Sequence, residues 1–394
     1  MRGVRDGGGG GGGGGPPGGG GGGGLAAPPS HASAHLASLL HQVGALRAQV
    51  ESFQLAKQDD IDWRATGYQA SEVPSDYRLA IRSRLLGGHA GRATALAWAA
   101  DNTTLVSVGT DGVVMLWNAM KGEIAAAAKV PDEDVLTCVH VERDRVGDDA
   151  LVLVGGLNQV CHVYRLSALR ATQGWQLKPE KALPAAGGCL SCVRVLEHER
   201  VLAGGADGVL RCYDLTLRRL ANKLDGHGGP VACAAVMPQD SDVCASGSAD
   251  GRVRVWDMRL ANERACVLSF GGFHGGGVTA IDFFPGGTAV AAGGMDSSVR
   301  LFDLRACGPV GVYCDARKRV GVNSLAFSAT GALLFAAYED PVCLAWEPMS
   351  ANSVVFDMKS DYSKPVRCLA SNGLAVALSG ELDEKPVADI CVWA

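Results

Sequence analysis

Apolar residues between positions 35 and 53 lie where a helix would carry them along one side. In the stretch HLASLLHQVGALRAQVESF they are spaced by three, four, three, four and three residues, at Leu36, Leu39, Val43, Leu46, Val50 and Phe53. This spacing is the a/d pattern of helices that wind around each other. Because one helix cannot bury such a seam alone, the pattern predicts a coiled-coil helix over residues 33–58 that needs a partner.

The segments on either side of this helix are predicted to have no packed core. Residues 7–24 are glycine, interrupted only by Pro16 and Pro17. Glycine offers no side chains to offset the entropy of ordering, so residues 1–32 are predicted to be a disordered Gly/Pro-rich tail. Residues 59–76, broken by Pro74, are predicted to be a linker.

From residue 77 to 394 the pattern changes to short alternating apolar runs separated by glycine and aspartate turns, which predicts strands. Relatives of the segment SADGRVRVWDMR recur, and each closes on an aromatic residue: Trp117, Tyr164, Tyr213, Trp256, Phe302, Trp346 and Trp393. Successive aromatics lie 43 to 49 residues apart, close to the period of about 40 to 45 residues of a four-stranded propeller blade. The fold is therefore predicted to be all-β, a seven-bladed propeller.

Three of the repeats begin with a histidine at a regular distance from a later aspartate. The separation is 22 or 23 residues in the pairs His89 with Asp111, His227 with Asp250, and His274 with Asp296. With Ser107, Trp117 and Trp256, these residues are predicted to form structural staples that hold the strands of a blade together. Serine, histidine and aspartate also occur in hydrolase triads, but an active site is needed once and a staple in each blade. Repetition therefore favours the staples, and no enzyme activity is predicted.

A further strand-like stretch, YRLAIRSRLLG from Tyr77 to Gly87, belongs to no repeat. We predict that it supplies the outer strand of the last blade and so pairs the two ends of the propeller region. Such pairing removes the open sheet edges on which the protein would otherwise aggregate.

Composition and charge narrow the range of functions. The net charge of −5 and the pI near 6.0 give no general attraction to nucleic acid. No apolar run approaches the roughly 20 residues that cross a bilayer, so membrane contact is expected only indirectly.

The thirteen cysteines are predicted to be mostly reduced and buried, and Cys189 and Cys192 lack the second pair of a zinc site. No GKS or GKT follows a glycine loop. Neither a cofactor nor a metal is predicted.

A heptad helix, a short linker and seven WD repeats, in this order, resemble the beta subunit of heterotrimeric G proteins. The stretches TLVSVGTDGVVMLWN, IDFFPGGTAVAAGGMDSSVRLFDLRA and SLAFSATGALLFAAYED carry the resemblance, which covers roughly residues 35–394. It implies a WD40 propeller whose N-terminal helix pairs with a prenylated gamma subunit through the six seam residues. It also implies binding to a GDP-bound alpha subunit and to effectors, downstream of G-protein-coupled receptors, at the cytosolic face of the plasma membrane.

The resemblance also implies which residues contact alpha and effectors. They are Arg92, Thr94, Asp134, Leu136, Leu157, Gln159 and Cys189. Asp134 and Cys189 stand where the family has aromatic residues, and further departures occur at Pro230, Ala232, Gly277, Thr279 and Met295. Because truncating an aromatic anchor commonly costs upward of about 2 kcal/mol, this face is expected to differ chemically from that of the family.

A second function remains open on the sequence alone. A generic WD40 adaptor, such as a ubiquitin-ligase substrate receptor or a kinase anchor, could use the same helix to form a homodimer. The helix could also fold back on its own propeller. The mass of the native complex would separate these alternatives, because only the first function requires a small partner.

Overall fold

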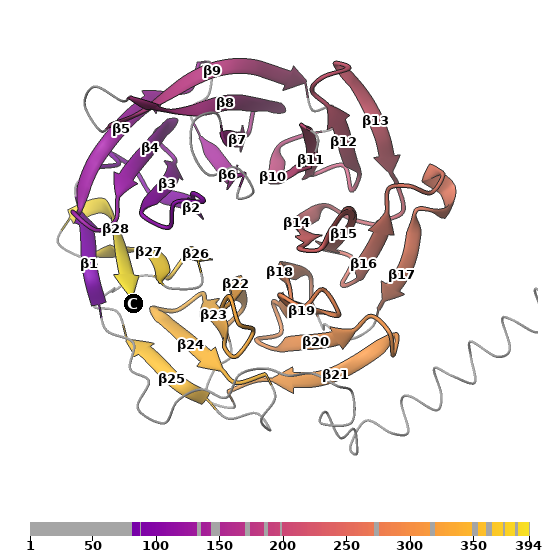
Figure 1. Cartoon of the computed structure of the whole chain (residues 1–394). Coiled ribbons are helices and arrows are strands. Elements are labelled where there is room, and N and C mark those ends of the chain that lie inside the picture. Colours follow the sequence, from indigo (N-terminus) through magenta and orange to yellow (C-terminus); the bar gives the residue numbers. More distant parts are fainter. Residues whose placement is uncertain are drawn as a thin grey trace, which may run out of the picture. The chain divides into compact units, whose positions relative to one another are not determined.

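The computed structural model describes residues 81–393, with gaps at 87, 132–134, 143–149, 170–173, 185–187, 198, 272–275, 316–319, 349–353, 360–364, 373–374 and 383–384. Within these ranges, 28 strands form seven four-stranded antiparallel sheets, arranged as blades around a common axis (Figure 1). The predicted seven-bladed all-β fold is thus confirmed. The predicted tail, helix and linker lie outside the described residues.

Each blade runs from an inner strand beside the axis to an outer strand at the rim (Figure 1). Blade 1 contains β2 (Ala93–Trp98), β3 (Thr104–Gly109), β4 (Val113–Asn118) and β5 (Glu123–Lys129). Blade 2 contains β6 (Leu136–Val141), β7 (Ala150–Gly156), β8 (Val160–Leu169) and β9 (Gly174–Pro184). Blade 3 contains β10 (Leu190–Leu196), β11 (Arg200–Gly205), β12 (Leu210–Asp214) and β13 (Arg219–Leu224).

The next three blades follow the same order. Blade 4 contains β14 (Val231–Met237), β15 (Asp240–Ser248), β16 (Val253–Asp257) and β17 (Cys266–Phe270), with the 3-10 helix η2 (Asn262–Arg264) before β17. Blade 5 contains β18 (Val278–Phe283), β19 (Ala289–Gly294), β20 (Val299–Asp303) and β21 (Gly308–Tyr313). Blade 6 contains β22 (Val322–Phe327), β23 (Leu334–Tyr338), β24 (Val342–Trp346) and β25 (Val354–Lys359).

Blade 7 joins the two ends of the propeller region. It contains β26 (Cys368–Ser371), β27 (Val376–Leu382) and β28 (Lys385–Trp393), and its outer strand is β1 (Ile81–Leu86). β1 runs antiparallel to β28, with Ile81 opposite Trp393 and Leu86 opposite Asp389. The prediction that the stretch before the first repeat closes the ring is confirmed.

The blades pack on one another through apolar side chains on their faces. One core cluster joins Val106 and Val114 of blade 1 to Val139 and Val152 of blade 2. Glycine in a second strand allows the next blade to come close, since a Cβ at Gly247 would lie only 2.4 Å from Cγ1 of Val278. Burial of these faces is the main stabilisation of the ring.

A ring of hydrogen bonds links the inner strands of successive blades. In five of the seven interfaces a side chain of one inner strand donates to a backbone carbonyl of the next blade: Thr94 to Leu136 (2.7 Å), Thr137 to Leu190, Ser191 to Val231, Thr279 to Val322, and Asn323 to Val366 (2.8 Å). The hydroxyl of Ser379 reaches the carbonyl of Ala93 at 3.4 Å between blades 7 and 1. Between blades 4 and 5 the corresponding residue is Ala232, which has no donor.

Restoring the missing bond is expected to stabilise the propeller. Ala232→Ser should place a hydroxyl near the carbonyl of Val278 and raise the free energy of unfolding by about 1 kcal/mol. Thr137→Val, which removes an existing bond, should lower it by a similar amount. Urea unfolding monitored by tryptophan fluorescence measures both. If both variants moved in the same direction, these bonds would not contribute to stability.

The thirteen cysteines, all within the described ranges, are free thiols, and nine of them are buried. Burial raises the pKa of Cys161 to about 12 and that of Cys192 to about 11. These thiols therefore stay protonated, as predicted for reduced core cysteines. Among the described residues, none of the helices has the length and hydropathy needed to cross a membrane.

Candidate functional site

The staple of blade 1 forms as predicted. His89 lies between two partners, with Nδ1 3.0 Å from an oxygen of Asp111 and Nε2 2.7 Å from the hydroxyl of Ser107. The indole Nε1 of Trp117 donates to the same hydroxyl at 2.7 Å. Because Nδ1 faces a carboxylate, the ring proton sits on Nδ1 and Nε2 accepts from the serine. The network joins the loop before β2 to β3, to the turn after it and to β4.

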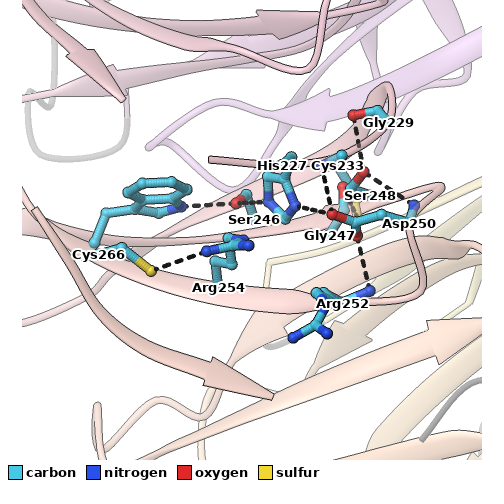
Figure 2. A network of polar contacts seen from close by, with 12 residues as sticks. His227, Gly229, Cys233, Ser246, Gly247, Ser248, Asp250, Arg252, Arg254 and Cys266 are labelled. Carbon is cyan, nitrogen blue, oxygen red and sulfur yellow. Dashed lines mark hydrogen bonds and ion pairs between the residues drawn. The ribbon is translucent and has the colours of Figure 1, made fainter. Parts of the chain in front are cut away.

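Blade 4 repeats this arrangement (Figure 2). Nδ1 of His227 donates to Asp250 at 3.0 Å, the hydroxyl of Ser246 donates to Nε2 of His227 at 2.7 Å, and the indole N–H of Trp256 donates to that hydroxyl at 2.8 Å. The backbone N–H of Arg252 also donates to Asp250, which fixes the turn between β15 and β16. With Ser246 and Trp256 buried, this polar network is a structural element of the blade.

Two glycines, Gly88 and Gly109, make room for the staple of blade 1. A Cβ at Gly88 would lie 2.3 Å from the ring of Trp117, and a Cβ at Gly109 would lie 2.8 Å from Nδ1 of His89. Both distances are shorter than real carbon contacts. The staple of blade 1 therefore requires glycine at both places, and the contact at Gly88 explains the glycine before His89.

Burial controls the protonation of the staple histidines. It lowers the pKa of His89 and of His227, and in each case this effect exceeds the opposing attraction of Asp111 or Asp250. Burial also acts to raise the pKa of Asp250, but hydrogen bonds from the Gly228 N–H, from His227 and from the Arg252 N–H together hold that pKa below its usual value. At neutral pH both staple imidazoles are therefore neutral, and the partner of His227 in blade 4 is a carboxylate.

The propeller is expected to lose stability as the pH falls below about 6.5, the pKa of histidine in unfolded chains. Between that value and the lower pKa of the folded state, the unfolded chain binds more protons, so the free energy of unfolding decreases with decreasing pH. Unfolding temperatures measured from pH 8 to pH 5 should fall, and the fall should be smaller in His89→Gln/His227→Gln. A stability that rose on acidification would contradict the assignment of neutral imidazoles.

The third predicted staple is not a copy of the first two. His274 lies outside the described residues, and blade 5 has Ala292 and Phe302 in the places of the serine and the tryptophan. Asp296 is 3.3 Å from Arg300, four residues later, and accepts from the hydroxyl of Ser298 at 2.7 Å. A stacked Phe302 and Phe270 pair, with ring centroids 4.7 Å apart, adds packing at this interface. Blade 5 therefore differs from the predicted serine-histidine-tryptophan pattern.

Two other blades show what replaces the staple. In blade 3, Asp207 pairs with Arg211 at 2.5 Å, again four residues along the chain. In blade 6, Ala336 takes the place of the serine, and the buried Nε1 of Trp346 has no hydrogen-bond partner. Blade 6 therefore relies on packing at this position.

Blade 4 has both a staple histidine, His227, and an arginine four residues after its turn aspartate, Arg254. Asp250 binds His227, and Arg254 instead directs Nη1 to the sulfur of Cys266 at 3.5 Å (Figure 2). Its Nε is buried and lacks an acceptor. Because Asp250 binds His227, blade 4 has a histidine-aspartate contact in place of the aspartate-arginine pair of blades 3 and 5.

A set of turns gathers on one face of the ring, which we call the turn face. Each turn joins the second and third strands of a blade, and its N–H donates to the carbonyl of the residue shortly before the inner strand. The donor and acceptor pairs are Thr110 with Arg92, Leu157 with Val135, Ala206 with Cys189, Ala249 with Pro230, Met295 with Gly277, and Glu339 with Gly321. The same backbone hydrogen bond therefore holds this turn in each of blades 1 to 6.

Four of the predicted alpha and effector contacts lie on the turn face: Arg92, Leu157, Gln159 and Cys189. Leu157 is 51% exposed and Met295, at the corresponding turn of blade 5, is 56% exposed. Exposed apolar side chains on rigid turns can be bound by a partner without rearrangement of the core. Asp134 lies outside the described residues.

Two of the predicted contacts have structural positions instead. Leu136 is completely buried between blades 1 and 2, so its side chain is not available to a partner. Thr94 is half-buried and its hydroxyl binds the carbonyl of Leu136. The surface role assigned to Leu136 is therefore wrong, and Thr94 belongs to the ring of inter-blade bonds.

With this geometry in view, comparison with protein families is informative. Residues 81–118, which include β1 and the first staple, match the family described as "WD domain, G-beta repeat". The chain is a seven-bladed WD-repeat propeller. A second match, to "Nucleolar protein 10-like, N-terminal domain", covers residues 219–381, which is part of the same propeller.

Three similar curated proteins carry the same description. The propeller is 28% identical over 327 residues to the "Guanine nucleotide-binding protein subunit beta" of Oryza sativa subsp. japonica, covering 79% of this chain and 82% of that protein. Proteins with the same description from Arabidopsis thaliana and Nicotiana tabacum are each 28% identical, over 325 and 353 residues. The tobacco alignment covers 85% of this chain and 90% of its relative.

The sequence carried signals for site residues that the prediction missed. Ser246 follows His227 by 19 residues, close to the 18 between His89 and Ser107. Arg211 and Arg300 each follow a turn aspartate by four residues. Both regularities are visible once the propeller repeats are aligned on their aromatic residues.

Proposed function

We propose that this WD-repeat propeller is the beta subunit of a heterotrimeric guanine-nucleotide-binding protein. In this function it forms a dimer with a prenylated gamma subunit, binds a GDP-bound alpha subunit on its turn face, and contacts effectors after alpha leaves. The gamma and alpha lipids hold it at the cytosolic face of the plasma membrane. The protein acts by binding and does not catalyse a reaction.

Two findings together carry this proposal. The propeller closes into a ring, and the relatives named above share one description and align with this chain over most of their own length. The relatives named above are described as G protein beta subunits and align over 82 to 90% of their own chains. The spacing of apolar residues from Leu36 to Phe53 predicts a helix with one apolar side, and the turn face offers exposed side chains on rigid turns. Identity of 28% leaves the choice of partners to experiment.

Pairing with gamma is tested through the seam. The full chain is purified from its own cells and its complex is weighed by native mass spectrometry. A small companion in equal amount, with a prenylated C-terminal cysteine, is expected. Leu46→Asp should abolish this pairing because it places a charge in the seam, whereas Ala48→Asp, at the heptad position that faces away from the seam, should not. A homodimer of the wild-type chain would favour the adaptor function instead.

Binding of alpha is tested through the turn face. Leu157→Ala should weaken binding of a GDP-loaded alpha subunit, and about tenfold is expected for removal of an exposed apolar contact worth about 1.4 kcal/mol. Leu217→Ala is the matched control, because Leu217 is 58% exposed but lies in the turn between β12 and β13. Equal affinities for the two variants would mean that the turn face around Leu157 is not used.

A further inference from the structure

Three neighbouring blades carry exposed arginines and leucines on the face of the ring opposite the turn face. Successive strands of a blade run in opposite directions, so the turn between the third and outer strands lies opposite the turn between the second and third. In blades 3, 4 and 5 (Figure 1), these turns lie within residues 215–220, 258–265 and 304–307, which we call the basic turns. Their exposed residues include Leu217, Arg218, Arg219, Leu220, Arg259, Leu260, Arg264 and Arg305.

Arginine forms the outermost layer of the basic turns, and the carboxylates beside it are recessed. Arg305 pairs with Asp303 at 3.4 Å, but its side chain is 55% exposed whereas that of Asp303 is 2% exposed. Arg259 pairs with Asp257 at 2.9 Å and with Asp240 at 3.1 Å, and its side chain is 54% exposed against 19% and 34%. Three further arginines form no ion pair with any residue that the structure describes: Arg218, Arg219 and Arg264.

The exposed layer has a net positive charge. Within the basic turns, which the structure describes throughout, the five exposed arginines stand against one exposed acidic residue, Glu263. On the same face of blades 3 and 4, Asp242 binds Arg200 at 2.7 Å and Glu199 binds Arg165 at 3.2 Å. Because these carboxylates already have partners, the arginines of the basic turns attract further anionic groups.

Exposed leucines accompany these arginines. Leu217 is 58% exposed, more than any other large apolar residue of the described chain. The leucine-bearing turns of blades 3 and 4 adjoin, since Nδ2 of Asn222 donates to the carbonyl of Met258 at 3.0 Å. Leucine and arginine together bind the interface of an anionic bilayer, where leucine enters the acyl boundary and arginine contacts the headgroups. Protein interfaces are instead anchored by aromatic residues, and the basic turns contain none.

We propose that the basic turns of blades 3 to 5 bind directly to a membrane surface rich in anionic phospholipids. The arginines contact the phosphate and carboxylate groups of the lipids, and Leu217 and Leu260 enter the acyl boundary. This contact goes beyond the proposed function, in which only the lipids of gamma and alpha reach the membrane. Because the basic turns lie at the rim of the ring, beside the outer strands, a membrane bound there leaves the turn face free for a protein partner (Figure 1).

The test separates anionic lipid from lipid in general. The full chain, purified from its own cells with whatever partner it has, is sedimented with vesicles of phosphatidylcholine alone or with about one-third phosphatidylserine. We expect at least about tenfold stronger binding to the anionic vesicles, weakening as salt is raised. A prenyl group on a partner inserts into both kinds of vesicle, so it does not produce this difference. Equal binding to the two kinds of vesicle would overturn the proposal.

Two double variants locate the contact on exposed residues whose change leaves the core intact. Arg218→Gln/Arg219→Gln should lower binding to the anionic vesicles at least about tenfold, whereas Arg252→Gln, an exposed arginine on the turn face of blade 4, should not. Leu217→Ser/Leu260→Ser should weaken binding while its salt dependence remains, and Met295→Ser on the turn face is the control.

Unchanged vesicle binding by either double variant, with its circular dichroism spectrum preserved, would overturn the inference. Native mass spectrometry of the same proteins tests the other occupants of this surface. If the arginine variant lost a bound protein, or a second copy of the chain, and the wild type bound no vesicles, the basic turns would bind protein and the proposal would be wrong.

Discussion

A chain that begins at Gly88 is expected to aggregate, whereas a chain that begins at Tyr77 folds. The shorter chain lacks β1, so β28 loses its antiparallel partner along Asp389 to Trp393. An exposed β28 edge then carries a row of unpaired backbone groups beside the buried core residues Ile390 and Val392. Such an edge is a template for pairing with other chains. Loss of β1 also removes the contact that joins the two ends of the propeller.

Size-exclusion chromatography with light scattering measures this difference. The two chains differ by the eleven residues of the stretch from Tyr77 to Gly87, and neither contains the seam residues, so the comparison isolates β1 from any helix partner. A monomeric, cooperatively unfolding chain beginning at Gly88 would show that blade 7 is stable with three strands and that closure is dispensable.

Ser246→Ala is expected to cost the second largest amount of stability, about 3 kcal/mol. The hydroxyl of Ser246 donates to Nε2 of His227 and accepts from the indole of Trp256. Its removal leaves an acceptor and a donor without partners in a site where Ser246 and Trp256 are completely buried, and each such group costs about 1 to 3 kcal/mol. Urea unfolding followed by tryptophan fluorescence gives the difference in free energy.

The matched control for this variant lies in the same blade. Ser269 is in β17 with an exposed side chain, so Ser269→Ala should change the free energy of unfolding by less than about 0.5 kcal/mol. Ser107→Ala should repeat the large effect, because blade 1 has the same network. Equal small effects at Ser246 and Ser269 would mean that the staple adds nothing beyond packing.

Much of the fold could be predicted because the repeat is regular. The seven closing aromatics from Trp117 to Trp393 fixed the number of blades, and a strand-like stretch without a repeat of its own predicted the closure by β1. The spacing from His89 to Asp111 and from His227 to Asp250 predicted the two staples, since only a turn after the second strand brings these residues together. Periodicity and spacing are local properties that a sequence displays directly.

The predicted contact residues were less reliable, because burial between blades depends on residues distant in the sequence. Leu136 and Thr94 were assigned through the resemblance alone, yet one is buried at an interface and the other bonds across it. The exposure of Leu157 could not be read from its own neighbours either.

Closure by the first and last strands also concerns the synthesis of the protein. β1 is synthesised before all the other strands of the propeller, and its partner β28 is synthesised after them. At about 5 to 20 residues per second, roughly 300 residues separate the two strands by some tens of seconds. Throughout this interval the nascent chain holds an unpaired strand and an incomplete ring. The protein is therefore expected to need protection from aggregation during translation.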